Sequence, residues 1–231
     1  MEDKSFEAVN AGFAGAFRPG RLSLGLVVPM ESYLMDDLPT LERHLERAQL
    51  AEELGFSALW LRDVPFNVPS FGDVGQMLDP FVYLGALAQV TDRIGLGVAS
   101  VILPLRHPAH VAKAAASADV LSGGRALLGV ASGDRPEEYP AMAADYENRG
   151  ARFRDSIDYI NAAFTDFPTL EADQGRLNGR IDMLPKPTGG RVPLLITGGA
   201  QQSPDWVAAH GDGWITYPRN LPMQEQTVAA Y

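Results

Sequence analysis

The sequence predicts an α/β fold in which parallel strands alternate with helices. Six short apolar strands, each followed by a helix, occur one after another along the chain. The strands are near-continuous apolar runs, which is typical of a parallel sheet covered on both faces. Three of the helices end at glycine, which takes the left-handed conformation of a helix end at little cost. This order favours a (β/α) barrel or a doubly wound sheet, and a closed barrel needs eight such units.

The clearest unit lies at residues 94–135. Apolar strands at 94–102 and 126–132 flank a helix at about 110–121, which is rich in valine and alanine and ends at two glycines. A strand, a helix and a second strand in this order form the crossover that joins parallel neighbours. In a parallel barrel the carboxyl ends of the strands face the active site. We therefore expect the chemistry of the protein just after these two strands.

The other elements follow the same alternation, and each depends on a local pattern. Apolar runs bounded by turn residues predict further strands at 22–28, 57–61, 193–197 and 213–217. Apolar residues at helical spacing, or a proline at the first helical position, predict further helices at 38–54, 80–91, 151–164, 203–210 and from about 222 onward. Clusters of Pro, Gly, Asn and Asp predict loops at 62–79 and 133–150, and 165–192 leaves room for a short hairpin.

One domain accounts for most of the chain. Residues 1–20 are predicted to be an irregular N-terminal arm, and residues 21–231 a single (β/α) barrel domain whose C-terminal units are missing or truncated. Six parallel strands leave an open sheet edge, so either the sequence is a piece of a longer protein or a partner subunit covers the gap. No Gly-x-Gly-x-x-Gly turn follows the first strand, which argues against a dinucleotide-binding Rossmann domain.

The composition excludes several classes of partner. The chain has 19 basic and 29 acidic residues and a formal charge of −10, whereas nucleic acids and anionic membranes are bound by basic surfaces. It has no cysteine, so it forms no disulfide and no thiolate metal site, as is compatible with a reducing cytoplasm. The N-terminus lacks the apolar core of a signal peptide, and no apolar run reaches the roughly 18 residues of a membrane span. We expect a cytoplasmic protein.

Four blocks of the sequence carry a family resemblance. They are GFSALWLRD (55–63), DPFVYLGALAQVTDRIGLG (79–97), LPLRHPAHVAKAAASADVLSGGRALLGV (103–130) and PLLITGGAQQSPDWVAAHGDGWIT (193–216). Together and in this order they resemble the bacterial luciferase-like, flavin-dependent monooxygenases, in a subgroup distinct from the light-emitting luciferases. The resemblance implies an eight-stranded (β/α) barrel of the TIM type, which carries reduced FMN or, in some branches, the deazaflavin F420 at its carboxyl-end mouth.

The resemblance also implies a function. We expect a homodimeric, two-component monooxygenase that takes reduced FMN from a separate NAD(P)H-flavin reductase and uses O2 to oxidise a small organic substrate. An F420-dependent oxidoreductase of the same superfamily, which transfers hydride without oxygen, is one alternative, and a non-catalytic flavin-binding protein is another. A phosphate-binding barrel lyase or isomerase is less favoured, since such enzymes use a lysine or paired carboxylates at strand ends and lysine occurs only at Lys4, Lys113 and Lys186.

The turn after the fifth strand is predicted to bind the cofactor phosphate. Gly198, Gly199 and Ala200 allow a ligand to approach the backbone closely, and Ser203 followed by Pro204 is a helix N-cap. Free amides at a helix N-terminus attract phosphate, and in barrels a phosphate commonly lies at such a late loop. By resemblance this is the FMN phosphate site. The alternative is an ordinary tight turn followed by a capped helix.

Two further strand ends are predicted to contact the flavin. By resemblance, the backbone at Ala99 and Ser100 passes beneath the flavin ring, often through a non-proline cis peptide, and small side chains permit that approach. Relatives often place a basic residue at the position of Ser132, and here the nearest basic group is Arg135. Either Arg135 substitutes for it, or amides and hydroxyls hold the phosphate alone. The alternatives are barrel-interior packing for the strand and a solvated loop charge for Arg135.

The predicted catalytic residues are Asp63 and His107. Luciferases and several relatives carry a histidine just after the acidic position that Asp63 occupies, whereas this sequence continues with Val64 and Pro65. His107 follows the third strand, close to the expected mouth, and is therefore the first substitute candidate for acid–base chemistry. A metal site is not expected, because His107 and His110 flank a proline and lack further ligands.

Overall fold

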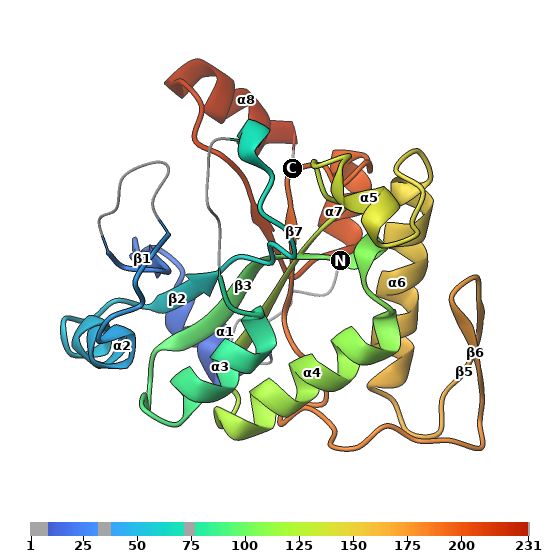
Figure 1. Ribbon diagram of the computed structural model, residues 1–231, viewed down its shortest axis with the longest axis horizontal. Coiled ribbons are helices and arrows are strands. Elements are labelled where there is room, and N and C mark those ends of the chain that lie inside the picture. Colours follow the sequence, from blue (N-terminus) through green and yellow to red (C-terminus); the bar gives the residue numbers. More distant parts are fainter. Residues whose placement is uncertain (1–8, 32–37, 72–76, 231) are drawn as a thin grey trace.

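The structure, a computed structural model, describes residues 9–31, 38–71 and 77–230. Six parallel strands form one curled sheet in the order β1-β2-β3-β4-β7-β8 (Figure 1). They are β1 (Gly25–Val27), β2 (Ala58–Leu61), β3 (Gly95–Ile102), β4 (Ala126–Ala131), β7 (Leu194–Thr197) and β8 (Gly213–Ile215). The sheet is a half-barrel, which confirms the predicted (β/α) barrel of about six units.

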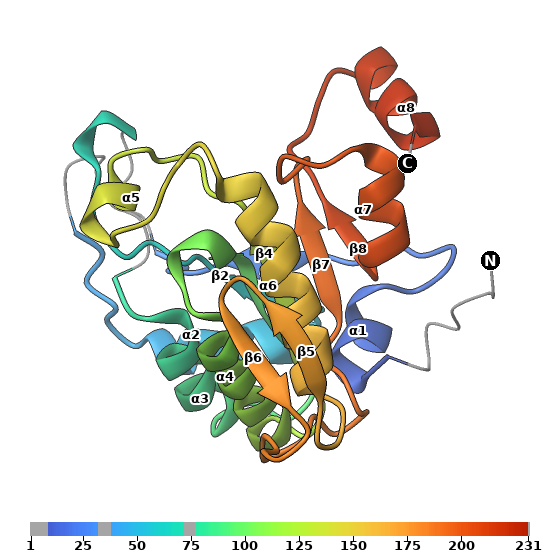
Figure 2. The same ribbon diagram turned by 90° about the vertical axis from the view of Figure 1, so that its right-hand side faces the viewer.

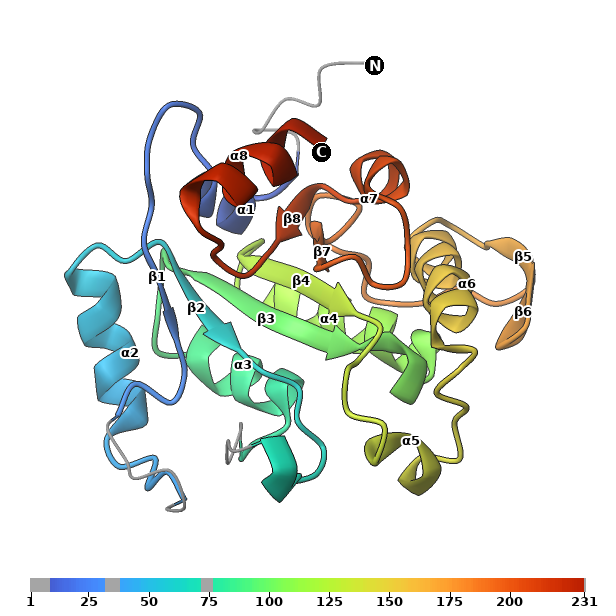
Figure 3. The ribbon, with the colours of Figure 1, turned by 90° about the horizontal axis from the view of Figure 1, so that it is seen from above.

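Helices precede, connect and follow the strands, and several of them cover the outer face of the sheet. The helices are α1 (Ala11–Ala16), α2 (His44–Glu53), α3 (Pro80–Ala88), α4 (Pro108–Leu121), α5 (Glu138–Ala141), α6 (Arg149–Ala163), α7 (Pro204–His210) and α8 (Leu221–Ala230), with the 3-10 turns η2 (Pro69–Phe71) and η3 (Leu103–Leu105). In Figure 3, α2, α3, α4 and α6 follow the outer side of the curved sheet. Because α3 packs on α4 and α4 on α6, the apolar strands are shielded from water on that side.

Most predicted elements are confirmed, and the differences are local. The helix predicted over 38–54 begins at His44, because Leu41 and Arg43 have positive φ angles of 55° and 53°, which a right-handed helix does not accept. The loop predicted at 133–150 contains the single turn α5. The segment 165–192 does hold a hairpin, in which β5 (Thr169–Ala172) pairs antiparallel with β6 (Gly175–Asn178) beside α6 (Figure 2).

The predicted irregular arm instead carries α1, which closes the amino end of the half-barrel. Phe13 is buried against Ala58, Leu127 and Leu195, which come from three different strands. Asn10 caps the helix by accepting a bond of 2.8 Å from the Phe13 amide, and its own amide group donates to Asp119 of α4 at 3.0 Å and to the Ala126 carbonyl at 2.8 Å. Long-range contacts therefore hold this six-residue helix in place.

Two glycines make room for a tryptophan inside the half-barrel. A Cβ added at Gly25 of β1 would lie 2.5 Å from the Trp60 indole nitrogen, and one added at Gly97 of β3 would lie 2.4 Å from its ring carbons. Trp60 stands on β2, between these two strands. Glycine on both neighbours thus lets the indole lie flat across the inner face.

Within the described residues the sheet has two unpaired edges, β1 and β8. Leu22, just before β1, is 92% exposed, and Tyr217, just after β8, is 78% exposed. Open edges of this kind agree with the predicted gap in the barrel. In the described part of the chain, no helix combines the length and the apolar character that crossing a membrane requires.

Candidate functional site

A cavity of about 390 Å³ lies at the carboxyl ends of β2, β3, β4 and β7. Eight of the ten predicted site residues line it: Asp63, Ala99, Ser100, Ser132, Arg135, Gly198, Gly199 and Ala200. Another hollow, of about 560 Å³, lies at the opposite end, among the segments that precede β1, β2 and β3. The carboxyl-end cavity is the better candidate site, because it is where the loops of a parallel barrel gather catalytic groups.

The floor of the cavity is an irregular stretch of β3. The Ala99-Ser100 peptide bond is cis, as the resemblance led us to expect, and the pairing of β3 with β4 shifts register between Val98 and Val101. The hydroxyl of Ser100 is hydrogen-bonded to that of Thr197, so the floor is tied to β7, two strands away. The backbone and two small side chains therefore form a surface that a flat ring can approach.

The turn after β7 forms one wall. Gly198, Ala200 and Gln201 have positive φ angles of 58°, 45° and 63°. Within the described chain the amides of Gly199, Ala200 and Gln201 donate to no protein acceptor. Three consecutive unpaired amides beside a cavity are suited to an anionic group. Ser203 lies outside the cavity lining, where its hydroxyl accepts a bond of 3.3 Å from the Trp206 amide and caps α7.

The segment after β4 forms the facing wall. Ser132 is buried, and its carbonyl accepts a hydrogen bond from the Tyr139 hydroxyl. Only glycine fits at position 133, because φ is 78° and an added Cβ would lie 2.8 Å from the Tyr139 oxygen. The guanidinium of Arg135 lies 4.7 Å from the centre of the Phe71 ring, a cation–π distance. Arg135 thus brings a buried positive charge to the lining.

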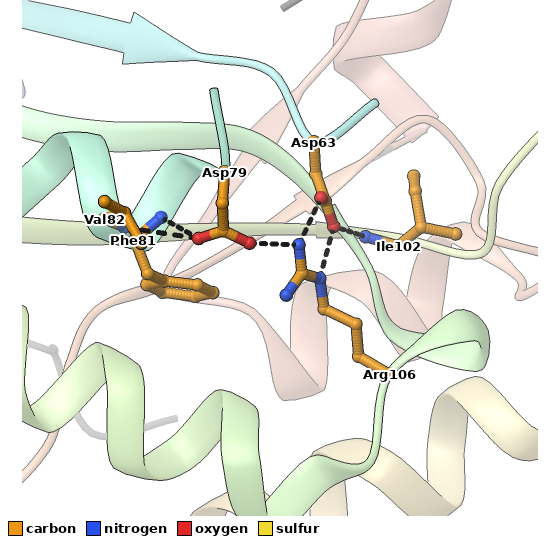
Figure 4. Close-up of polar contacts among 6 residues, drawn as sticks. All are labelled: Asp63, Asp79, Phe81, Val82, Ile102 and Arg106. Atoms are coloured by element: carbon orange, nitrogen blue, oxygen red, sulfur yellow. Dashed lines mark hydrogen bonds and ion pairs between the residues drawn. The ribbon is translucent and has the colours of Figure 1, made fainter. Parts of the chain in front are cut away.

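Asp63 takes part in an ion-pair network that the sequence did not reveal (Figure 4). Its two oxygens accept from Arg106, at 2.8 Å from Nε and 2.7 Å from an η nitrogen, and Oδ2 also accepts from the Ile102 amide at 3.2 Å. The same Arg106 nitrogen donates to Asp79, the N-cap of α3, at 2.9 Å. Because both its oxygens are occupied, Asp63 serves as an anchor here rather than as an available acid or base.

The pKa values in this network follow from its geometry. Burial acts to lower the pKa of Arg106, but its bonds to Asp63 and Asp79 outweigh that effect and raise it. Burial acts to raise the pKa of Asp79, but Arg106 and the amides of Val82 and Phe81 hold it below its ordinary value. Arg106 and Asp79 therefore stay charged at neutral pH. Arg106 joins the two ends of the loop between β2 and α3.

His107 does not reach the cavity. It is the N-cap of α4, where Nδ1 accepts a bond of 3.2 Å from the Ala109 amide. Its ring packs edge-on against Tyr159, with the ring centres 5.9 Å apart, and it does not line the cavity. The structure thus gives His107 a place in the helix cap and no geometric support for the predicted acid–base role. Among the described residues, no group of three His, Asp or Glu side chains is arranged to hold a metal ion.

Sequence reasoning missed Glu138, the first residue of α5. It lines the cavity but is only 3% exposed. Burial raises the pKa of this carboxyl, Arg135 offsets part of the rise, and the charges of Asp63 and Asp134 add to it. In the sequence Glu138 stands close to Asp134, Arg135 and Glu137, and no pattern distinguishes the buried residue from the exposed ones.

The raised pKa of Glu138 predicts how stability depends on pH. A group whose folded-state pKa exceeds its unfolded value contributes stability that is present at low pH and is lost as pH rises through the folded pKa. Starting from the ordinary value of 4.5, the wild-type chain should therefore lose stability relative to Glu138→Gln as pH rises. Urea unfolding of both chains at a series of pH values from below 4.5 upward checks the prediction. A difference in unfolding free energy between the two chains that does not vary with pH would contradict it.

One family model matches the sequence. It describes the luciferase-like monooxygenases, and the match covers residues 15–231. The chain belongs to this family. The match confirms the family predicted from the sequence, whose members are oxidoreductases.

The chain is also similar to individual proteins of known sequence or structure. An uncharacterized protein of Mycobacterium tuberculosis is 31% identical over an alignment 194 positions long, which covers 77% of this chain and 68% of that protein. The crystal structure of the monooxygenase RslO1 from Streptomyces bottropensis has a TM-score of 0.75 at 22% identity, over 91% of this chain and 64% of that one. The structure of an F420-dependent secondary alcohol dehydrogenase in complex with an F420-acetone adduct has a TM-score of 0.68 at 22% identity, over 90% of this chain and 64% of that one. The chain thus spans less than two thirds of these solved structures.

Proposed function

We propose that this luciferase-like chain binds reduced FMN in the carboxyl-end cavity and acts as the oxygenating component of a two-component monooxygenase on a small organic substrate. The observation that carries the proposal is the cavity itself. It combines a floor of small residues at a cis peptide, three unpaired backbone amides on one wall and a buried arginine on the other. Reduced FMN, when bound, would supply the electrons with which O2 is activated.

The residues present fit a flavin phosphate and ring. The amides of Gly199, Ala200 and Gln201 would hold the phosphate, and Arg135 would add positive charge across the cavity. Ala99 and Ser100 would support the ring, since neither side chain is large enough to keep it away. Phe71, which packs on Arg135, would help to exclude water from the reacting atoms.

A second candidate is an F420-dependent oxidoreductase, which transfers hydride without oxygen. The similarity to the F420-dependent alcohol dehydrogenase favours it, and both cofactors carry a phosphate and a flat tricyclic ring. The lack of a histidine after Asp63 is compatible with this reading, as it is with a flavin-binding protein that has no catalytic role. A separate flavin reductase, a homodimer and a cytoplasmic location are further parts of the monooxygenase proposal.

Rapid mixing separates these candidates. The anaerobic chain is mixed with reduced FMN and then with oxygenated buffer, and the flavin absorbance is followed. A long-lived species distinct from oxidised flavin supports the monooxygenase. Reoxidation as fast as that of free FMN contradicts it, and a parallel titration with F420 then tests the second candidate.

Gly199→Asp should weaken FMN binding about tenfold or more. An added side chain fits here, because a Cβ would meet only the Gln202 carbonyl oxygen at 3.6 Å. The new carboxylate would face the flavin phosphate, and two like charges about 4 Å apart repel by several kcal/mol near a protein surface. Fluorescence titration measures the effect, with Gly199→Asn as the uncharged control. Equal affinity of the two variants would place the phosphate elsewhere.

A further inference from the structure

Glu138 is a buried acid in the wall of the cavity. It begins α5, three residues after Arg135, and its side chain is 3% exposed. Acidic side chains are almost never buried so deeply unless they are paired, because an ionised carboxylate loses much of its hydration. A buried carboxyl beside a cavity therefore calls for an explanation.

The contacts of Glu138 satisfy only one of its oxygens. The Phe66 amide, from the loop between β2 and α3, donates to the carboxyl group. Its Oε1 is buried and has no hydrogen-bond partner among the described residues. A neutral carboxyl explains this arrangement, since one oxygen can accept from Phe66 while the other carries a proton.

Burial favours the neutral form of Glu138, and the surrounding charges act in both directions. Arg135 attracts the ionised carboxylate, whereas Asp63 and Asp134 repel it. Arg135 also lies over the ring of Phe71, and Asp63 is paired with Arg106. The neighbouring Tyr139 adds no charge, because burial raises its pKa to about 12, and its hydroxyl donates to the Ser132 carbonyl.

We infer that Glu138 is the proton donor of the cavity. The carboxyl O–H bond of Glu138, which lines the cavity, breaks, the proton forms a new bond to an oxygen or nitrogen of the molecule bound there, and the carboxylate that is left takes a proton from water. The inference rests on the proposed function for the identity of that molecule. It assigns the proton transfer to Glu138 and not to His107, which caps α4 outside the lining.

Protonation of Glu138 can be measured without any cofactor. Carbon-13 NMR of the chain labelled at the glutamate carboxyl carbons gives one resonance that Glu138→Gln removes. Gln keeps the side-chain shape and can still accept from the Phe66 amide, so this variant is expected to fold. The inference predicts that the resonance titrates above the ordinary value of 4.5. Titration at the ordinary value would overturn it.

The transfer itself is tested by following reoxidation of reduced FMN by O2 across pH in four chains: wild type, Glu138→Gln, Glu137→Gln and His107→Ala. Glu137 is the exposed neighbour, so its variant makes the same chemical substitution without touching the cavity. Removing a general acid typically slows a reaction 10²–10⁴-fold, so Glu138→Gln should slow reoxidation about 100-fold and abolish its fall at high pH. The other two variants should keep the wild-type profile.

The outcomes distinguish this inference from the proposed function. If Glu138→Gln binds FMN normally and retains the wild-type rate and pH profile, Glu138 is only a positioning residue for the loop at Phe66 and the inference fails. If the wild-type chain binds neither FMN nor F420, the proposed function fails. A slowed rate in His107→Ala with a normal rate in Glu138→Gln would restore His107 as the donor and overturn the inference.

Discussion

Arg106→Ala is expected to lower the free energy of unfolding by about 3–5 kcal/mol, the usual cost of removing one partner from a buried ion pair. Asp63 is 7% exposed and would be left buried without its partner. Asp79 would lose its bond to the same guanidinium, so both ends of the loop between β2 and α3 would be released. Urea denaturation, monitored by circular dichroism, measures the change.

Two variants serve as controls for this prediction. Arg106→Lys keeps the charge but cannot form the two parallel bonds to Asp63, so it should lie between wild type and alanine. Arg43→Ala breaks a pair with Glu46 in which both side chains are more than half exposed, and it should change stability little. If Arg106→Ala were no more destabilising than Arg43→Ala, the network would not anchor the loop.

Phe13→Ala is expected to cost about 3–5 kcal/mol, as is usual for truncating a buried phenylalanine. Phe13 is 5% exposed and fills the amino end of the half-barrel between Ala58, Leu127 and Leu195. These strand residues cannot move together to fill the space, because backbone pairing fixes their strands. Thermal and urea unfolding of the variant measure the loss.

Leu22→Ala is the matched control, since Leu22 lies on the same N-terminal segment and is 92% exposed. It should leave stability unchanged within about 0.5 kcal/mol. Equal stability of the two variants would mean that α1 does not seal the barrel, and the irregular arm predicted from the sequence would then describe this segment better.

The sequence was sufficient for the strands and most of the helices because their patterns are local. Apolar runs bounded by glycine or proline located all six parallel strands to within three residues at each end. The sequence did not predict α1, because this helix has only six residues, two of them glycines, and is too short to be stable in isolation. That helix depends on Asn10 and Phe13, whose partners lie more than 40 residues away along the chain.

The site was predictable in place but less so in detail. Knowing that the carboxyl ends of parallel strands meet was enough to gather Ser100, Ser132 and Gly199 around one cavity. The roles of individual residues were harder to predict, because Asp63 and Glu138 are both acids in loops and only their neighbours in space distinguish them. Arg106 occupies the two oxygens of Asp63, whereas Glu138 is buried with one oxygen unpartnered in the described chain.

The most direct test of the account is to titrate FMN into the nitrogen-15-labelled chain and to follow its amide resonances by NMR. We predict that the largest shifts occur at Ser100 and at Gly199, Ala200 and Gln201, since the ring and the phosphate would lie there. Shifts confined to Arg18, Arg21 and Arg93, which line the hollow at the opposite end of the half-barrel, would contradict the account.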